Sequence, residues 1–175
     1  MKQITEYLST KVAQTKIKAT NETIYSIVIS ELDRLGYDAN LNHIDVSEVT
    51  DMDSLFSDCA DRYKDINPDI SKWNVTNVHD MRYMFEGCEK FNCDISGWNV
   101  SNVEFMMQIF RGCKNFNQDL SQWNVRNVKY MQGMFYECKN FNQDLSQWDI
   151  RKVKDRRYMF EECPIKEEFK PKFKI

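Results

Sequence analysis

Glycine, proline and long apolar runs are all scarce in this chain. Only five glycines and three prolines occur among 175 residues, which excludes collagen-like and low-complexity architectures and leaves few positions for sharp turns. No stretch approaches the roughly 18 apolar residues of a membrane-spanning helix. The first residues lack the apolar run of a signal peptide, and neither end carries a lipidation motif. The sequence therefore predicts a protein without membrane association, which we expect to be cytoplasmic.

Groups that commonly carry chemistry are also few. The only histidines are His43 and His79, and neither belongs to a pattern of nucleophile and base. There is no glycine-rich phosphate loop and no pair of closely spaced cysteines that would suggest a metal site. The sequence thus predicts no catalytic residues, no metal and no cofactor. The formal net charge of −3 argues against a nucleic-acid binder, although residues 150–175 hold nine Lys or Arg against five Asp or Glu.

What the chain does have is an internal repeat. Aromatic residues make up 13% of the sequence and methionine occurs nine times, so large apolar side chains are plentiful. They recur every 25 residues in three series: Trp73, Trp98, Trp123 and Trp148; Phe85, Phe110, Phe135 and Phe160; Cys88, Cys113, Cys138 and Cys163. Cys59 lies 29 residues before Cys88, so four residues are inserted within 60–68. Such a fixed period is the signature of a stacked repeat architecture.

Each repeat contains two apolar periodicities. In the third repeat, Leu120, Trp123, Val125 and Val128 have the spacing of a leucine-rich repeat, and the alternation at Trp123 and Val125 indicates a strand. From Val128 to Cys138 the apolar spacing indicates one face of a short helix. The sequence predicts an α/β fold: a right-handed leucine-rich-repeat-like solenoid of about 4–5 coils of 25 residues over 41–163, preceded by an N-terminal arm and capping helix in 1–40 and followed by a C-terminal cap or tail in 164–175.

The repeat resembles that of the BspA-like family of leucine-rich-repeat-related proteins, also described as the domain of unknown function 285. The hallmark is present as WNVTNVHDMRYMFEGCEKFNCDIS over Trp73–Ser96 and in two further close copies. The resemblance implies a solenoid fold. It implies surface adhesion and protein binding for secreted members, whereas short versions without a signal resemble proteins of gut Bacteroidales and their phages.

The ends of a repeat stack need covers. Residues 20–36 have Ile24, Ile27, Val28, Leu32 and Leu35 on one helical face, Thr20 or Asn21 as N-cap and Gly36 as a terminator, so we expect a helix there. Residues 1–19 alternate weakly and could form a short strand pair or an arm for a partner. Residues 166–175 alternate Phe and Lys, which predicts an amphipathic lid over the last repeat.

Polar side chains also recur, and we expect their roles to be structural. The asparagines predicted to satisfy turn backbones are Asn67, Asn92, Asn117 and Asn142; the partners predicted to bond locally to turn N–H groups are Asp69 with Ser71, Asp94 with Ser96, Asp119 with Ser121, and Asp144 with Ser146. The regular cysteines are predicted to be small buried apolar groups. Cys93 replaces the glutamine of later repeats, and we expect it to be exposed, either as a chance substitution or as a reactive thiol.

Two surfaces are candidate binding sites. If the tryptophans point inward, their polar neighbours point out from the predicted sheet; this partner-binding face comprises Lys72, Asn74, Asn99, Gln122, Asn124, Arg126, Gln147, Asp149 and Arg151. A second interface is predicted at Phe105, Met107 and Tyr130, because exposed aromatic and methionine side chains favour interfaces.

We therefore expect a non-enzymatic module that presents a surface to a protein partner of unknown identity. One alternative is a structural component of a larger assembly, such as a phage particle, with self-association or incorporation into a virion. A carbohydrate-active enzyme is a remote second alternative.

Overall fold

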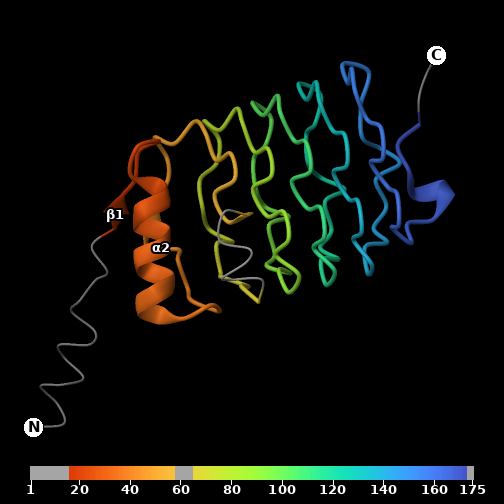
Figure 1. Ribbon diagram of the computed structural model, residues 1–175. Helices are drawn as coiled ribbons and strands as arrows, with labels where there is room; N and C mark the ends of the chain where they lie inside the picture. Colours follow the sequence, from red (N-terminus) through yellow and green to blue (C-terminus); the bar gives the residue numbers. More distant parts are fainter. Residues whose placement is uncertain (1–15, 58–64, 173–175) are drawn as a thin grey trace, which may run out of the picture.

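The computed structural model describes residues 16–57 and 65–172. Its regular elements are strand β1 (Ile17–Lys18), helix α2 (Ile24–Leu35), strand β2 (Ile44–Asp45) and a short 3-10 helix, η2 (Glu167–Phe169). The two strands pair in parallel, with Ile17 opposite Ile44. Figure 1 shows α2 at one end of an elongated molecule and η2 near the other, with a series of similar loops side by side between them.

The predicted α/β solenoid of leucine-rich-repeat type is wrong. Residues 69–163 contain neither an α-helix nor a strand; they consist of consecutive turns. The strand expected at Trp123 and Val125 and the helix expected from Val128 to Cys138 are both missing. Successive repeats meet instead at isolated parallel bridges: Asn40 with Asp69, Asp51 with Asp80, Asp80 with Phe105, Phe105 with Tyr130, and Tyr130 with Asp155.

Left-handed residues explain why no helix forms. Residues Tyr83, Gln108, Gly133 and Tyr158 occupy the same place in successive repeats and all have φ between 53° and 62°. A second left-handed residue follows four positions later, at Gly87, Gly112, Glu137 and Glu162. A left-handed residue cannot continue a right-handed helix, so each repeat consists of successive turns. The apolar spacing read as a helix comes from hydrogen-bonded turns, as in Met134 N–H to the Met131 carbonyl at 3.2 Å.

The repeats are joined by what we call the peptide ladder, in which alternate N–H groups donate to carbonyls of the next repeat. Between the second and third repeats its bonds run from Met106 to Tyr130, Gln108 to Gln132, Phe110 to Met134 and Gly112 to Tyr136, at 2.8–3.1 Å. Equivalent sets link residues 81–87 to 105–111 and residues 131–137 to 155–161. Every donor faces the C-terminal end of the stack and every acceptor faces the N-terminal end. These bonds offset the cost of the left-handed residues, roughly 1–2 kcal/mol each where the residue is not glycine.

Aromatic columns fill the core. Neighbouring rings of the series Phe56, Phe85, Phe110, Phe135 and Phe160 lie 5.3–5.7 Å apart with nearly parallel planes. A second series, Phe91, Phe116 and Phe141, stacks beside it. Phe110 is fully buried and sits only 4.2 Å from Phe116. Offset parallel rings at these distances are a favourable arrangement, so the 25-residue period of the aromatics is explained by contact between repeats.

The tryptophans are buried as expected. All four are 3–4% exposed, and each indole N–H donates to a backbone carbonyl of the preceding repeat. The acceptors are Leu41 for Trp73, Ile70 for Trp98, Ile95 for Trp123 and Leu120 for Trp148, at 2.9–3.3 Å. The indole therefore supplies both apolar area and a backbone partner.

The helix expected over 20–36 is observed as α2. Ile24, Val28 and Leu32 are buried and Gly36 ends the helix with φ 93°. The N-cap is Thr23 rather than Thr20 or Asn21, and Leu35 is 45% exposed.

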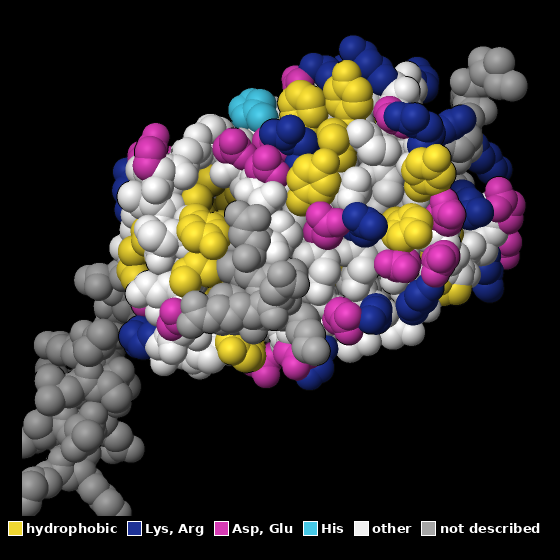
Figure 2. All heavy atoms as spheres, viewed as in Figure 1, with side chains coloured by type: hydrophobic (Ala, Val, Ile, Leu, Met, Phe, Trp, Pro, Cys, Tyr) yellow, Lys and Arg dark blue, Asp and Glu magenta, His cyan; other side chains and the backbone are white. Residues whose placement is uncertain are grey.

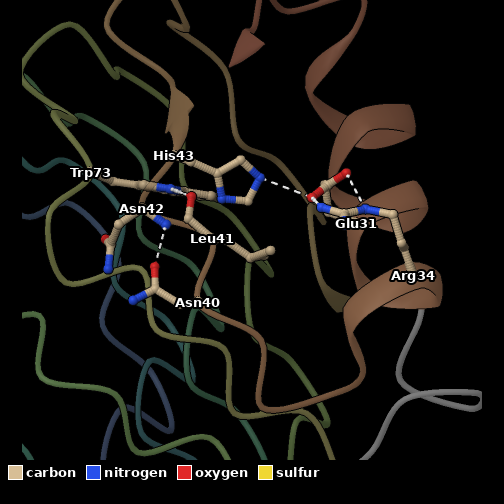
Figure 3. Close-up of polar contacts among 7 residues, drawn as sticks. All are labelled: Glu31, Arg34, Asn40, Leu41, Asn42, His43 and Trp73. Atoms are coloured by element: carbon tan, nitrogen blue, oxygen red, sulfur yellow. Dashed lines mark hydrogen bonds and ion pairs between the residues drawn. The ribbon is translucent and has the colours of Figure 1, made fainter. Parts of the chain in front are cut away.

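A buried polar cluster fastens α2 to the first repeat (Figure 3). The Glu31 carboxylate lies 2.8 Å from Nε2 of His43 and accepts a hydrogen bond from Nε of Arg34 at 3.1 Å. Glu31 and His43 are only 7% and 8% exposed. The hydrogen bond from Arg34, and then that from His43, hold the pKa of Glu31 below its ordinary value. The helix is thus held by a charge-assisted contact as well as by its apolar face.

The asparagine and aspartate series have the structural roles expected of them. Oδ1 of Asn67, Asn92 and Asn117 each accepts the N–H of the next asparagine in the series, at 2.8–3.0 Å. Asp69, Asp94, Asp119 and Asp144 each accept the N–H of the serine two residues later. These bonds satisfy backbone groups in turns that lack a regular ladder.

At the C-terminal end the tail lies against the last repeat. The N–H of Leu145 donates to the carbonyl of Phe169 at 2.8 Å, and Phe169 packs partly buried on the core. Three parts of the sequence predictions lie outside the described residues: residues 173–175 of the predicted lid, residues 1–15 of the N-terminal segment, and Cys59.

Candidate functional site

The nine predicted partner-binding residues lie at the surface, though not on a sheet. Eight are exposed and Asp149 is partly buried. They follow turns, and the side chains of Asn74, Asn99, Asn124 and Asp149 each accept the N–H of the residue two positions later, at 3.2–3.4 Å. We call these nine residues the polar strip. The oxygens of these three asparagines and of Asp149 are therefore already engaged in their own turns, which reduces what they offer to a ligand.

The structure brings together only the C-terminal members of the strip. Asn124, Arg126, Asp149 and Arg151 line one hollow of about 340 Å³. Arg151 contacts the Asp149 carboxylate at 2.6 Å, and Arg126 approaches it at 3.6 Å. The hydrogen bond from Arg151 lowers the pKa of Asp149 to about 2. The end of the strip is therefore a basic surface in which one carboxylate is enclosed by two guanidinium groups.

Two further hollows open on the C-terminal end of the stack. One, of about 410 Å³, is lined by Gln147, Trp148 and Arg151 among others. The second, of about 670 Å³, is lined by Tyr158, Phe160, Lys170 and residues between and around them. Lys172 borders both hollows, so they adjoin at this residue and together make up the concave part of this end. We call it the end surface.

The peptide ladder is incomplete at this end. The N–H groups of Tyr158, Phe160 and Glu162 are the counterparts of donors that bond to the next repeat at earlier junctions. Among residues 16–57 and 65–172 none of these three N–H groups has a hydrogen-bond acceptor. This feature cannot be predicted from the sequence, because it depends on the peptide ladder and not on the predicted sheet.

The predicted second interface is mostly engaged between repeats. The rings of Phe105 and Tyr130 stack at 5.6 Å with planes 3° apart, and the guanidinium of Arg82 lies 5.7 Å from the Phe105 ring. Both rings and Met107 are partly buried. Figure 2 shows hydrophobic side chains on this view of the molecule scattered among charged ones. The structure thus shows no broad apolar patch on this view.

One hollow was missed by the sequence reasoning. It measures about 370 Å³ and lies over Gly133, between Gln108 of the preceding repeat and Tyr158 of the next. A usable signal was present, since Gly133 stands in the position held by Tyr83, Gln108 and Tyr158 in the other repeats.

Burial keeps the thiols of three described cysteines, Cys93, Cys113 and Cys138, from being reactive. Cys113 and Cys138 are fully buried, and burial raises the pKa of both thiols well above the ordinary value. Each donates to a phenylalanine carbonyl of the preceding repeat, at 3.0 and 2.9 Å. Cys93 is partly buried rather than exposed, and burial raises its pKa too. Thiolates are the reactive form, so none of these three is activated.

No group of three or more metal-binding side chains occurs in the described part of the chain. Nor does any helix among the described residues have the length and apolar character needed to cross a membrane.

These features define a stacked-repeat protein with two adjoining hollows at its C-terminal end. The model of the family described as "Mycoplasma protein of unknown function, DUF285" matches residues 31–92 and 59–172. The chain therefore belongs to that family. No match was found among curated proteins or among solved structures.

Proposed function

We propose that this protein is a non-enzymatic interaction module that binds a partner polypeptide on its end surface. The observation that carries the proposal is the row of N–H groups at Tyr158, Phe160 and Glu162, which lack acceptors in the described structure. A partner segment that offers backbone or side-chain oxygens would continue the peptide ladder. Backbone donors gain stability when they exchange water for a well-placed acceptor in a partly dehydrated interface.

The charge around the end surface favours an acidic partner. Residues 150–172 contain eight Lys or Arg against five Asp or Glu, whereas the chain as a whole is acidic. The larger hollow is lined by three basic residues, Arg156, Lys170 and Lys172, and by two carboxylates, those of Glu161 and Glu167. Lys170 pairs with Glu167 at 2.6 Å, so Lys172 is the basic residue of this hollow that we test. Complementary charge raises the association rate and selects among partners, so the segment we propose carries carboxylates.

A defined peptide tests this proposal. Fluorescein-labelled dodecamers of glutamate and of lysine are titrated with the protein at low salt, and binding is followed by anisotropy. We expect the glutamate peptide to bind and the lysine peptide not to bind. Lys172→Glu should weaken binding at least fivefold, whereas Lys16→Glu, the same charge change at the opposite end, should have little effect. Equal effects of the two substitutions, or binding of neither peptide, would refute the proposal.

The basic end of the polar strip extends the same surface. Arg151 lines both the strip hollow and the adjoining end hollow. We therefore expect Arg126→Glu to weaken binding of the glutamate peptide without lowering the melting temperature. Unchanged binding would remove the strip from the proposed site.

A second candidate, a component of a larger assembly, is favoured by a different observation. The carbonyls of Asp51, Asp53 and Leu55 correspond to ladder acceptors of later repeats, and no described residue donates to them. The two ends of the stack are thus complementary, and end-to-end stacking would pair them. The resemblance to BspA-like proteins of Bacteroidales and their phages is compatible with either role, including incorporation into a phage particle.

Helix α2 lies at the N-terminal end in Figure 1, and Phe56 is already fully covered there, which is why we prefer the module. Light scattering after size-exclusion chromatography separates the two. A monomer at all concentrations favours the module, and mass that grows with concentration favours assembly.

A further inference from the structure

A further hollow lies over Gly133, and it shares only Tyr158 and Glu161 with the end surface. The position of Gly133 in the repeat carries a tyrosine or glutamine in the three other complete repeats, and all four residues are left-handed. Because Gly133 has no side chain, a hollow of about 370 Å³ remains between the side chains of Gln108 and Tyr158. Pockets that hold small ligands span roughly 300–1,000 Å³, so this one suits a single small unit.

The walls of the hollow are aromatic on two sides. Tyr158 is 65% exposed, which makes it the most exposed of the large hydrophobic residues. Tyr136 also lines the hollow, and the Arg111 guanidinium lies 5.2 Å from its ring centroid. The Tyr158 ring is therefore accessible to a ligand, while Tyr136 is held in place by its cationic neighbour.

The polar groups of the hollow offer both donors and acceptors. Oε1 of Gln132 is buried and has no hydrogen-bond partner in the described structure. Oε1 of Gln108 accepts from Arg111 at 3.1 Å, so the amide is oriented and its NH₂ group stays a donor. Glu161 adds an exposed carboxylate. A buried amide oxygen without a partner is costly, and because the Gln132 side chain lines the hollow, a ligand hydroxyl that draws this amide into the hollow would satisfy its oxygen.

We propose that this hollow binds one unit of a neutral carbohydrate. The combination of an accessible aromatic ring, two amides and a carboxylate fits the apolar C–H face and the hydroxyls of a sugar. Arg111 disfavours a cationic ligand, and Glu161 disfavours an anionic one. Hydrolysis of a glycosidic bond generally uses two carboxyl groups, and the hollow contains one, so the activity is binding.

The chain supplies a matched pair of variants. Gly133→Gln places in the hollow the residue that the preceding repeat already accommodates at φ 53°. Its Cβ would lie 3.0 Å from Cγ of Gln108, so the Gln108 side chain must shift and the hollow closes further. Gly97→Gln is the control, because the two following repeats carry glutamine there and a Cβ at Gly97 meets nothing within 4 Å.

The test is an array of neutral glycans followed by saturation-transfer NMR with methyl glycosides of the glycans that bind. We expect wild type and Gly97→Gln to bind the same glycans, Gly133→Gln to lose binding, and Tyr158→Ala to weaken it at least tenfold. Unfolding curves of each variant show whether the fold is kept.

Three results would overturn the proposal: no neutral glycan binds, Gly133→Gln binds as well as wild type, or only methylammonium or acetate gives a signal at this site. Tyr158 and Glu161 also line the larger end hollow, whereas Gly133 lines neither end hollow. Gly133→Gln therefore separates the two proposals, because it should abolish glycan binding and leave binding of the glutamate peptide unchanged.

Discussion

Two phenylalanines of one aromatic column should differ in their contribution to stability according to their place in the stack. Phe110 is fully buried and has ring neighbours on both sides, Phe85 at 5.7 Å and Phe135 at 5.6 Å. Phe160 is partly buried and has one ring neighbour, Phe135 at 5.6 Å, with the Lys170 ammonium 5.9 Å from its centroid. The comparison isolates the effect of position, because both residues belong to the same series.

The expected magnitudes follow from burial. Truncating a fully buried phenylalanine to alanine costs about 3–5 kcal/mol, because a cavity remains. At Phe160 only part of the side chain is removed from water, so about 1–2 kcal/mol is expected. For a chain of this size each kcal/mol lowers the melting temperature by roughly 2–4 °C. We therefore expect Phe110→Ala to melt about 6–20 °C below wild type and Phe160→Ala about 2–8 °C below it.

Urea unfolding provides the assay, since the four buried tryptophans report on the core by fluorescence. The midpoint should fall for both variants while the dependence of the unfolding free energy on urea stays unchanged. Equal losses at Phe110 and Phe160 would refute the stacking argument. So would a loss at Phe110 below about 2 kcal/mol, because the site would then not be the tightly packed centre that the distances indicate.

Three further outcomes are expected. Glu31→Gln should lower the free energy of unfolding by about 1.5–3 kcal/mol at pH 7. Since the pKa of Glu31 is depressed in the folded state, this difference from wild type should persist above the unfolded-state pKa and shrink as the pH falls through the folded-state pKa. A difference in urea midpoints that does not depend on pH would contradict this. Glu137→Gly should raise the melting temperature, because Glu137 has φ 58° at the position where Gly87 and Gly112 stand in earlier repeats. The relief of left-handed backbone strain should exceed the entropic cost of glycine. A lower melting temperature would show that the Glu137 side chain stabilises the fold by more than its backbone strain costs. Arg151→Gln should raise the Asp149 pKa from about 2 toward 3.8, as read from a carboxyl NMR titration, and an unmoved value would mean that Arg151 is not its cause.

The sequence predicts the packing well and the backbone poorly. The 25-residue period correctly identified the buried tryptophans, the buried cysteines at 113 and 138, and the local roles of the Asn and Asp series. The sequence predicts helices where the structure has turns, because hydrogen bonds between residues i and i+3 give nearly the same apolar spacing as a helical face. Nothing in the side chains of Tyr83, Gln108 or Tyr158 indicates a left-handed backbone. For Tyr83 and Gln108 the next repeat supplies the hydrogen bond that supports this conformation.

The candidate sites also differ in how far the sequence predicts them. Exposure of the polar strip could be foreseen, since residues on either side of a buried tryptophan must face outward. The open ladder at the C-terminal end could not, because it exists only in a backbone of aligned peptides. The hollow over Gly133 was within reach, because a glycine among bulky residues at one repeat position marks a missing side chain.

The direction of the peptide ladder bears on which end of the molecule binds. Its peptide units are parallel, with N–H groups toward the C-terminal end and carbonyls toward the N-terminal end, so the C-terminal end is electropositive as the N-terminus of a helix is. Stability of the free stack would be served by carboxylates at that end. The sequence does the reverse, since residues 150–172 carry an excess of lysine and arginine, among them Lys170 and Lys172 in the open hollow. The positive side-chain charges and the positive end of the peptide dipoles therefore lie at the same end of the molecule. A partner that brings carboxylates to this electropositive end would stabilise it most.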